Sequence, residues 1–265
     1  MRLPPETVAA LAADAVEVVG AASPHPLLLL CEHAGNRVPG PWCNLGLPAA
    51  LLESHFGYDP GVDGLTRDLA ARLGAPAVLA RYSRLFVDYN RFEQDWDHMR
   101  PDLGGIPVPA NLAINPSEKA LRRAIAVEPV DEAIRPIVTG RRAVVSVHSF
   151  TPVMGGHRRD VDIGVLWRKD SAFTRAMLAG LQAHPSGFRI GDNAPYDWRT
   201  AMAYSLQTYG LDLGLPCFYL EVNNALFSDS ETSARVASTI GDALESVCAS
   251  AFGAPAGTDE IAERR

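Results

Sequence analysis

The sequence predicts an α/β fold with a mostly parallel central sheet and helices on both of its faces. Apolar segments of strand length alternate along the chain with segments of helical periodicity, which is the pattern of parallel strands joined by helices. The segment Leu27 to Cys31 is apolar at every position, as expected of a strand that is buried on both faces. Polar motifs directly follow several of these strands, and sheets of this kind bind ligands at the carboxyl ends of their strands.

The first part of the chain supplies a leading helix, a buried strand and a longer helix. Ala and Val dominate residues 5–19, which indicates a short helix. Residues 32–48 are rich in Gly, Pro and Asn and are predicted to form a loop. Asp59 and Pro60 are typical of the N-cap and first position of a helix, whose apolar residues recur three or four positions apart until Gly74 ends it.

The later elements continue the alternation. Further strands are predicted at residues 77–80, 85–89, 143–147, 162–167 and 218–222. Further helices are predicted at residues 117–140, 171–183 and 230–246. Residues 93–116 contain four prolines and are predicted to form a long loop, and loops of this length are often functional. We expect one domain over residues 1–253 and a disordered tail over residues 254–265.

The composition excludes several classes of partner. A formal net charge of −7 argues against binding to a nucleic-acid backbone. No apolar run approaches the roughly 20 residues that span a bilayer, and the N-terminus lacks the pattern of a secretory signal. The four cysteines are widely spaced, as expected of reduced thiols. We therefore expect a cytoplasmic protein that acts on a small molecule.

Two histidines at strand ends could ligate a metal ion. His33 lies in the Cys-Glu-His-Ala-Gly-Asn motif after the first buried strand, and His148 follows the apolar run 143–147. With an acidic residue they would form a His/His/carboxylate site with an open position for water, a ligand set that suits zinc. No His-Glu-x-x-His helix motif is present, and a single strand-end histidine is more often a hydrogen-bonded structural residue. Position alone therefore leaves both interpretations open.

Two carboxylates are candidates for the same chemistry. Asp59 is explained fully by helix capping, and a role as metal ligand is the alternative. Glu221 stands in an otherwise apolar strand, where a carboxylate is costly unless it is paired or reaches a cavity. Glu221 could act as the general base for a water molecule, or form a salt bridge at the rim of the sheet.

Residues 83–91 place polar groups at both ends of a predicted strand. The planar fork of an arginine matches a carboxylate, so Arg91 beside Asn90, together with Arg84, suits recognition of an amino-acid carboxylate. The alternative is that one of these arginines pairs with Asp88 or another acid and closes the strand end. The sequence contains no Gly-x-Ser-x-Gly elbow and no glycine-rich nucleotide motif, so a serine hydrolase and a nucleotide-binding protein are not supported.

Other polar residues are weaker candidates. His157, Arg158 and Arg159 form a basic cluster that we expect to be solvated. His55 has no supporting neighbours in the sequence.

Several ordered motifs resemble the N-formylglutamate amidohydrolase family, from about residue 25 to about residue 245. The matching segments are residues 31–39, 44–48, 58–61, 81–91, 145–152, 191–196 and 221–222. This family is similar in fold to zinc carboxypeptidases and aspartoacylases. The resemblance therefore implies a central mixed sheet, mostly parallel, with helices on both faces.

The resemblance also implies roles for the candidate ligands. His33 and His148 match the histidine ligands of one zinc ion. Asp59 matches an acidic position of the family and is the predicted third ligand, with Glu32 as its competitor.

The remaining roles concern the substrate. Asn90 and Arg91 look like the Asn-Arg pair that holds the substrate carboxylate in related enzymes, and Arg84 would be a second contact. Glu221 corresponds to the catalytic glutamate. The implied reaction is zinc-dependent hydrolysis of an N-acyl amino acid, with N-formyl-L-glutamate giving formate and glutamate.

The alternatives are another N-acyl amino acid, a peptide-like amide, or a silent module that only binds a carboxylate. The chain departs from the family pattern at Asn223, Ala194 and Tyr209, in the C-terminal half of the expected pocket, which leaves a changed substrate and lost activity open as alternatives.

Overall fold

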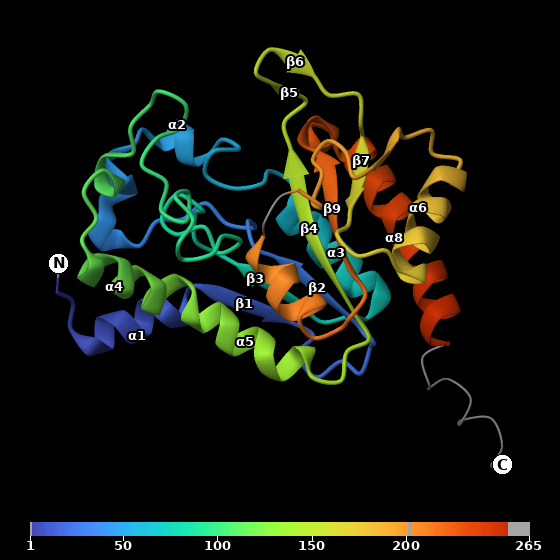
Figure 1. The fold of residues 1–265 in the computed structure, drawn as a ribbon, viewed down its shortest axis with the longest axis horizontal. Helices are drawn as coiled ribbons and strands as arrows, with labels where there is room; N and C mark the ends of the chain where they lie inside the picture. The colour runs from blue at the N-terminus through green and yellow to red at the C-terminus, as the bar shows by residue number, and fades with distance from the viewer. Residues whose placement is uncertain (1, 201–202, 254–265) are drawn as a thin grey trace.

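A mixed sheet of seven strands lies at the centre of the computed structural model, which describes residues 2–200 and 203–253 (Figure 1). The strand order is β1-β3-β2-β4-β9-β7-β8. The strands are β1 (Val16–Val19), β2 (Leu27–Cys31), β3 (Ala77–Ala80), β4 (Ala143–Phe150), β7 (Ile163–Leu166), β8 (Ile190–Asp192) and β9 (Cys217–Asn223). The predicted tail, residues 254–265, lies outside the described residues.

The inner strands of the sheet are parallel and its edges are mixed. Strand β2 runs parallel to β3 and β4, and β4 runs parallel to β9. Strand β1 is antiparallel to β3, and β7 is antiparallel to β9 and parallel to β8. The predicted fold class, a mixed and mostly parallel sheet with helices on both faces, is confirmed.

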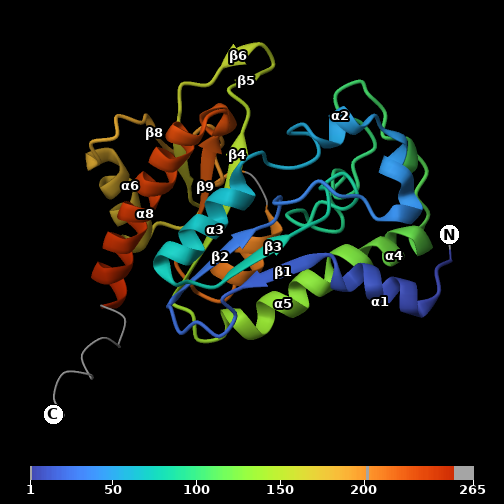
Figure 2. The ribbon, with the colours of Figure 1, turned by 180° about the vertical axis from the view of Figure 1, so that it is seen from behind.

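Two layers of helices cover the sheet (Figures 1 and 2). One face packs against α3 (Val62–Leu73), α6 (Ala172–Ala183) and α8 (Ser230–Phe252). The other carries α1 (Pro5–Ala13), α4 (Pro116–Ala126) and α5 (Glu128–Val138). Successive residues of β2 alternate between these two cores, with Leu29 facing the first and Leu30 the second, which explains why this strand is apolar throughout.

The shorter elements lie in the connections. They are the helices α2 (Ala49–Leu52) and α7 (Tyr204–Leu206), a π-helical turn at Gln207–Leu211, 3₁₀ segments at Gly40–Gly46, Pro109–Asn111 and Asn224–Phe227, and a hairpin of β5 (Val153–Met154) and β6 (His157–Arg158). The hairpin projects beyond the end of β4 (Figure 1).

Three of the predicted elements differ from those of the structure. Residues 85–89 form turns and not a strand, because the Ser83 carbonyl accepts hydrogen bonds from the backbone of Phe86 and Val87 and its hydroxyl accepts one from Leu85. The single helix predicted over residues 117–140 consists of α4 and α5, with a break at Val127. In addition, the predicted leading helix ends at Ala13, so that its last β-branched residues instead form the edge strand β1.

The predicted N-cap of α3 is also wrong. The cap is Gly61 and not Asp59, and Gly61 has a positive φ of 87°. A Cβ atom at Gly61 would lie 2.2 Å from ring carbons of Phe227, so both the backbone conformation and the close packing require glycine. The Asp59 side chain is thereby left to point toward the edge of the sheet.

The parallel strands β2, β4 and β9 bring the polar motifs to one edge. His148 is paired in register with Glu221, and Ser146 with Tyr219, so these four side chains lie on the same face of the sheet. None of the helices in the described part of the chain has the length and apolarity that a membrane span needs.

Candidate metal centre and substrate cavity

Three potential ligand atoms converge at the carboxyl edge of the sheet. The Nδ1 atoms of His33 and His148 are 3.2 Å apart, and an Asp59 carboxylate oxygen lies 2.9 Å from the His148 nitrogen and 3.5 Å from the His33 nitrogen. All three residues are buried. The expected proximity of the two histidines, which are far apart in the sequence, is therefore confirmed.

The outer nitrogen of each imidazole is held by a second carboxylate. His33 Nε2 lies 2.7 Å from Asp88 Oδ1, and His148 Nε2 lies 3.1 Å from Glu32 Oε2. Burial and the nearby Arg84 charge lower the pKa of His33 to about 4, so this imidazole is neutral at pH 7 and carries one proton. A proton on Nε2, shared with Asp88, leaves the lone pair of Nδ1 directed toward the centre.

This arrangement fits a metal ion. Two imidazole nitrogens and a carboxylate oxygen point at one another, which is unfavourable for lone pairs alone and favourable around a cation. Tetrahedral zinc with bonds of about 2.0–2.1 Å would separate its ligand atoms by about 3.3 Å. The separations in the triad bracket that value. The carboxylates behind the imidazoles supply the outer hydrogen bonds that metal-binding histidines usually make.

Asp59 and Glu32, the two competing third ligands, occupy different positions. Asp59 contributes its oxygen on the Nδ1 side of both rings, whereas Glu32 contacts the opposite nitrogen of His148. Burial by itself would raise the pKa of Glu32. Hydrogen bonds from His148, Ser146 and Ser205 outweigh burial and lower this pKa to about 2. Glu32 is therefore an ionised partner behind the imidazole and lies on the far side of the ring from the triad.

The second oxygen of Asp59 faces positive charge. Arg84 donates a hydrogen bond to Asp59 Oδ1. His55 Nδ1 lies 3.2 Å from the same oxygen without forming a hydrogen bond. Burial, followed by the Arg84 charge, lowers the pKa of His55 to about 3, so it is a neutral side chain beside the triad.

Glu221 reaches the same cavity from the neighbouring strand. It is adjacent to His148 in the register of β4 and β9, and its Oε2 atom is buried without a hydrogen-bond partner among the described residues. Burial raises the pKa of Glu221, against the opposing charges of His148, Arg84 and Arg159. A carboxylate that is desolvated and unpaired in a cavity is suited to accepting a proton.

Asn90 is held in a single orientation. Its Oδ1 atom accepts hydrogen bonds from the backbone N–H of Ser205, at 3.1 Å, and from the Tyr219 hydroxyl, at 3.2 Å. The Ser205 hydroxyl is a third donor, at 3.0 Å. These donors identify that atom as the oxygen and turn the amide nitrogen the other way. Because Asn90 lines the cavity, its N–H groups are available to an anionic ligand there.

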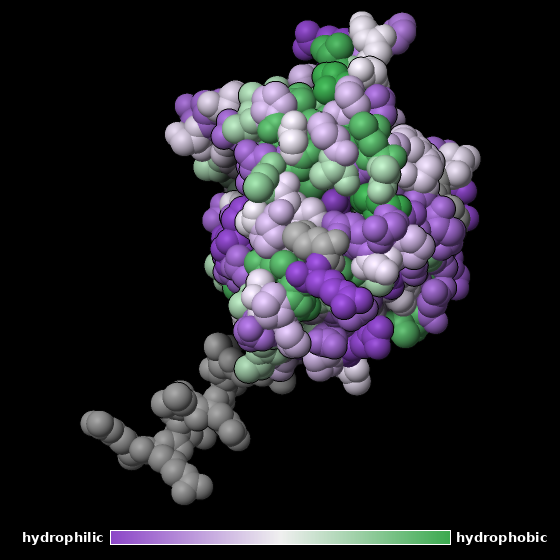
Figure 3. All heavy atoms as spheres, turned by 90° about the vertical axis from the view of Figure 1, so that its left-hand side faces the viewer, coloured by the Kyte–Doolittle hydropathy of each residue, from purple (hydrophilic) through white to green (hydrophobic). Residues whose placement is uncertain are grey.

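The triad opens into a cavity of about 680 Å³, which is within the usual range for small-molecule sites. All seven predicted site residues line it, which brings together segments from five separate parts of the chain. Aromatic and aliphatic side chains complete the wall, namely Phe56, Val153, Met154, Leu166, Tyr196, Trp198 and Tyr219. In Figure 3 hydrophobic residues gather below the projecting hairpin, while polar residues predominate lower on the same face.

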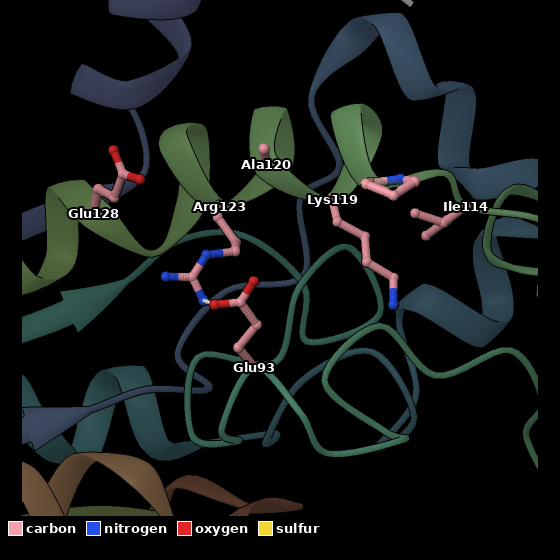
Figure 4. A pocket seen from close by; sticks show the side chains of 7 residues that line it. Glu93, Ile114, Lys119, Ala120, Arg123 and Glu128 are labelled. Carbon is pink, nitrogen blue, oxygen red and sulfur yellow. Dashed lines mark ion pairs between the residues drawn. The ribbon is translucent and has the colours of Figure 1, made fainter.

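A second, smaller cavity shares none of these residues. It has a volume of about 270 Å³ and is lined by Glu93, Ile114, Pro116, Lys119, Ala120, Arg123 and Glu128 (Figure 4). In it Arg123 forms an ion pair of 2.8 Å with Glu93, an exposed side chain. No group of three potential metal ligands occurs there among the described residues.

Sequence reasoning missed the supporting roles of several residues around the site. Asp88 and Glu32 hold the histidines, and Ser205 bridges Glu32 and Asn90. Tyr219 could have been found, because it lies two positions before Glu221 and therefore on the same face of the strand. Ser205 gives no such signal, since only the tertiary fold brings it close.

The expected basic cluster is only partly solvated. His157 and Arg158 are exposed, as expected. Arg159 is half-buried, and its guanidinium lies 4.6 Å from the centroid of the Tyr196 ring that lines the cavity.

The three departures from the family pattern are not among the residues that line the cavity. Tyr209 donates to Asp131 at 2.6 Å, and Asn223 accepts a hydrogen bond from the backbone of Ala225. The carbonyl oxygen of Ala194 packs against Gly164, where a Cβ atom would lie 2.1 Å from it.

The fold and the site define a hydrolase-like α/β protein with a candidate metal centre at the end of its sheet. The model of the N-formylglutamate amidohydrolase family matches residues 25–228, and the chain belongs to this family.

Solved structures show further similarity. A gene product of Agrobacterium tumefaciens is 32% identical, with a TM-score of 0.82, and the match covers 89% of this chain and 96% of that one. A metallo-carboxypeptidase from Burkholderia cenocepacia is 14% identical, with a TM-score of 0.43 and coverage of 92% and 68%. Murine aminoacylase 3 is 11% identical, with a TM-score of 0.39 and coverage of 85% and 65%. No curated protein matches the chain.

Proposed function

We propose that this protein is a zinc-dependent amidohydrolase that cleaves the amide bond of an N-acyl amino acid, with N-formyl-L-glutamate as the expected substrate. The observation that carries the proposal is the convergence of three lone-pair donors in a cavity that also holds an unpaired carboxylate and an Asn-Arg pair. The family match supports the amide-cleaving class of reaction.

His33, Asp59 and His148 would hold the metal ion. When bound there, zinc would polarise the amide carbonyl and acidify a water molecule. Asp88 and Glu32 would keep both imidazoles oriented, because each fixes the Nε2 side of one ring.

Glu221 would move the proton. Its carboxylate accepts a proton from the attacking water while the new C–O bond forms, and then delivers that proton to the nitrogen as the C–N bond breaks. With N-formyl-L-glutamate the products are formate and glutamate. The raised pKa of Glu221 favours this role, since the group must hold the proton between the two steps.

Asn90 and Arg91 would position the substrate. The free amide N–H groups of Asn90 and the guanidinium of Arg91 line one side of the cavity and can bind the α-carboxylate. Arg84, which pairs with Asp59, would contact the carbonyl oxygen or a carboxylate beside the metal ligands. Holding the amide in place converts a collision into a positioned attack.

The test is metal-dependent formate release. The protein is stripped with a chelator, reloaded with zinc and assayed on a panel of N-formyl and N-acetyl amino acids. We expect no turnover by the stripped protein, turnover after reloading, and one zinc per chain by elemental analysis. A zinc-loaded protein that cleaves no member of the panel would overturn the proposal and favour a silent carboxylate-binding module.

A further inference from the structure

We infer that Arg100 selects substrates whose amino-acid part carries a second carboxylate. This inference rests on the proposed function and adds a specificity residue that the sequence analysis did not single out. Arg100 lines the same cavity as the triad, Asn90 and Arg91.

The three arginines of the cavity lining differ in whether a carboxylate of the protein pairs with them. Arg84 forms an ion pair with Asp59, and Arg91 forms one of 2.9 Å with Asp97. Arg100 has no carboxylate partner in the described part of the chain, and its Nε atom donates only to the backbone oxygen of Asp102, at 2.9 Å. A cation in a cavity without a protein counter-ion attracts an anionic group of the ligand.

The Arg100 side chain is held in place although it lies in a long loop. Its guanidinium carbon lies 5.4 Å from the centroid of the Trp96 ring, a cation–π contact. The hydrogen bond from its Nε atom to the Asp102 carbonyl fixes the inner end of the guanidinium. Both contacts leave the terminal nitrogens of the guanidinium available to a ligand.

The backbone around Arg100 is also fixed. Asn111 is buried and donates a hydrogen bond of 2.9 Å to the Arg100 carbonyl. The Asn111 side chain in turn accepts one of 2.7 Å from Arg122, which is fully buried. Val108 closes the loop with a hydrogen bond of 2.8 Å to Pro101. A cation on such a supported loop can discriminate between ligands, because little ordering entropy is lost on binding.

Two anion sites in one cavity indicate a dicarboxylate. Asn90 and Arg91 would hold the α-carboxylate, and Arg100 would hold the carboxylate at the end of the side chain. Glutamate and aspartate are the amino acids with that second group. A cavity of about 680 Å³ has room for both carboxylates together with the acyl group at the metal centre.

The experiment compares N-formyl-L-glutamate with N-formyl-L-glutamine, which has nearly the same shape and no side-chain charge. The zinc-loaded wild type is assayed beside Arg100→Met, which keeps the length of the side chain, and Arg100→Lys, which keeps its charge. The control is Arg175→Met, which removes an exposed arginine of α6 that pairs with Asp170. Thermal unfolding of each variant verifies that the fold is retained.

We expect the ratio of kcat/KM for the glutamate over the glutamine substrate to fall about 10- to 100-fold in Arg100→Met, as for a lost hydrogen bond between charged groups. The ratio should be largely retained in Arg100→Lys and unchanged in Arg175→Met. An unchanged ratio in a folded Arg100→Met variant would overturn the role of Arg100.

A binding measurement separates this inference from the proposed function. Calorimetry compares L-glutamate and L-glutamine on the zinc-loaded wild type and on Arg100→Met. If the wild type cleaves neither substrate, the proposed function fails. A preference for glutamate that disappears in Arg100→Met would still support recognition of the second carboxylate by Arg100. Equal binding of the two amino acids by the wild type would overturn it.

Discussion

Two cavities in the described part of this protein, of about 680 and 270 Å³, both contain arginine and glutamate side chains, yet their charges are arranged differently. In the smaller one, the Arg123–Glu93 pair joins a half-buried side chain to an exposed one, so water screens it. In the larger one, His33, Asp59 and His148 are buried, and each histidine has its own carboxylate behind it. Such a cluster costs free energy to desolvate, and a bound cation would compensate for that cost. Concavity alone therefore does not identify a functional site; converging buried ligands with their own partners do.

The sharpest test of this contrast is Glu221→Gln. We expect formate release to fall by about 10²–10⁴-fold, because glutamine keeps the shape of the side chain but cannot accept the proton of water. The fold and the bound zinc should be retained, as measured by thermal unfolding and elemental analysis. Glu93→Gln in the smaller cavity is the matched control and should keep full turnover. Wild-type-like activity in Glu221→Gln would remove Glu221 from the mechanism.

The second-largest effect is expected from substituting the carboxylates that contact the outer nitrogens of the histidines. Asp88→Asn should weaken zinc binding about 10- to 100-fold, because an amide is a poorer acceptor for the His33 Nε2 proton and leaves the imidazole less basic. Competition with a chelating dye measures the affinity. Excess zinc should restore much of the turnover. Glu128→Gln, a carboxylate change in the smaller cavity, should leave zinc affinity unchanged, and equal effects of the two variants would contradict the distinction between the cavities.

The third comparison concerns two paired arginines. Arg91→Ala should raise KM roughly 10- to 100-fold with a smaller effect on kcat, because Arg91 would contact a carboxylate whose charge does not change during the reaction. Arg123→Ala removes a similar ion pair from the smaller cavity and should leave both constants unchanged. A loss confined to kcat in Arg91→Ala would place this arginine at the reacting atoms instead.

The sequence predicted the parts of this site that depend on local pattern. Strand β2 is apolar throughout, so its carboxyl end, and with it His33, could be located without a structure. Residues 85–89 also begin with an apolar run, Leu85 to Val87, but the hydrogen bonds of Ser83 turn the chain there. Asp59 had a sufficient local explanation as a cap, which the close packing at Gly61 overrides.

The supporting contacts of the site were beyond prediction for a different reason. Ser205 lies more than a hundred positions from both Glu32 and Asn90, yet its hydroxyl bonds to Glu32 and its backbone N–H to Asn90. Arg100 likewise becomes a candidate only when the partners of all cavity arginines are compared. Pairings of this kind are properties of the tertiary structure, and no periodicity in the sequence reports them.

The smallest expected effect tests the orientation of Asn90. Tyr219→Phe removes one of the three donors to Asn90 Oδ1, the others being the backbone N–H and the hydroxyl of Ser205, and the lost hydrogen bond should cost about 0.5–1.5 kcal/mol. The amide can then rotate and present its oxygen to the substrate carboxylate, so we expect KM to rise about two- to tenfold with little change in kcat. Zinc affinity should not change, since Tyr219 is not hydrogen-bonded to His33, Asp59 or His148.

Tyr82→Phe is the matched control, because the Tyr82 hydroxyl donates to the backbone of Leu11, outside the cavity. Both variants should lower the free energy of unfolding by a similar amount, but only Tyr219→Phe should raise KM. Equal KM values in the two variants would mean that the backbone N–H and hydroxyl of Ser205 are sufficient to hold Asn90 in place.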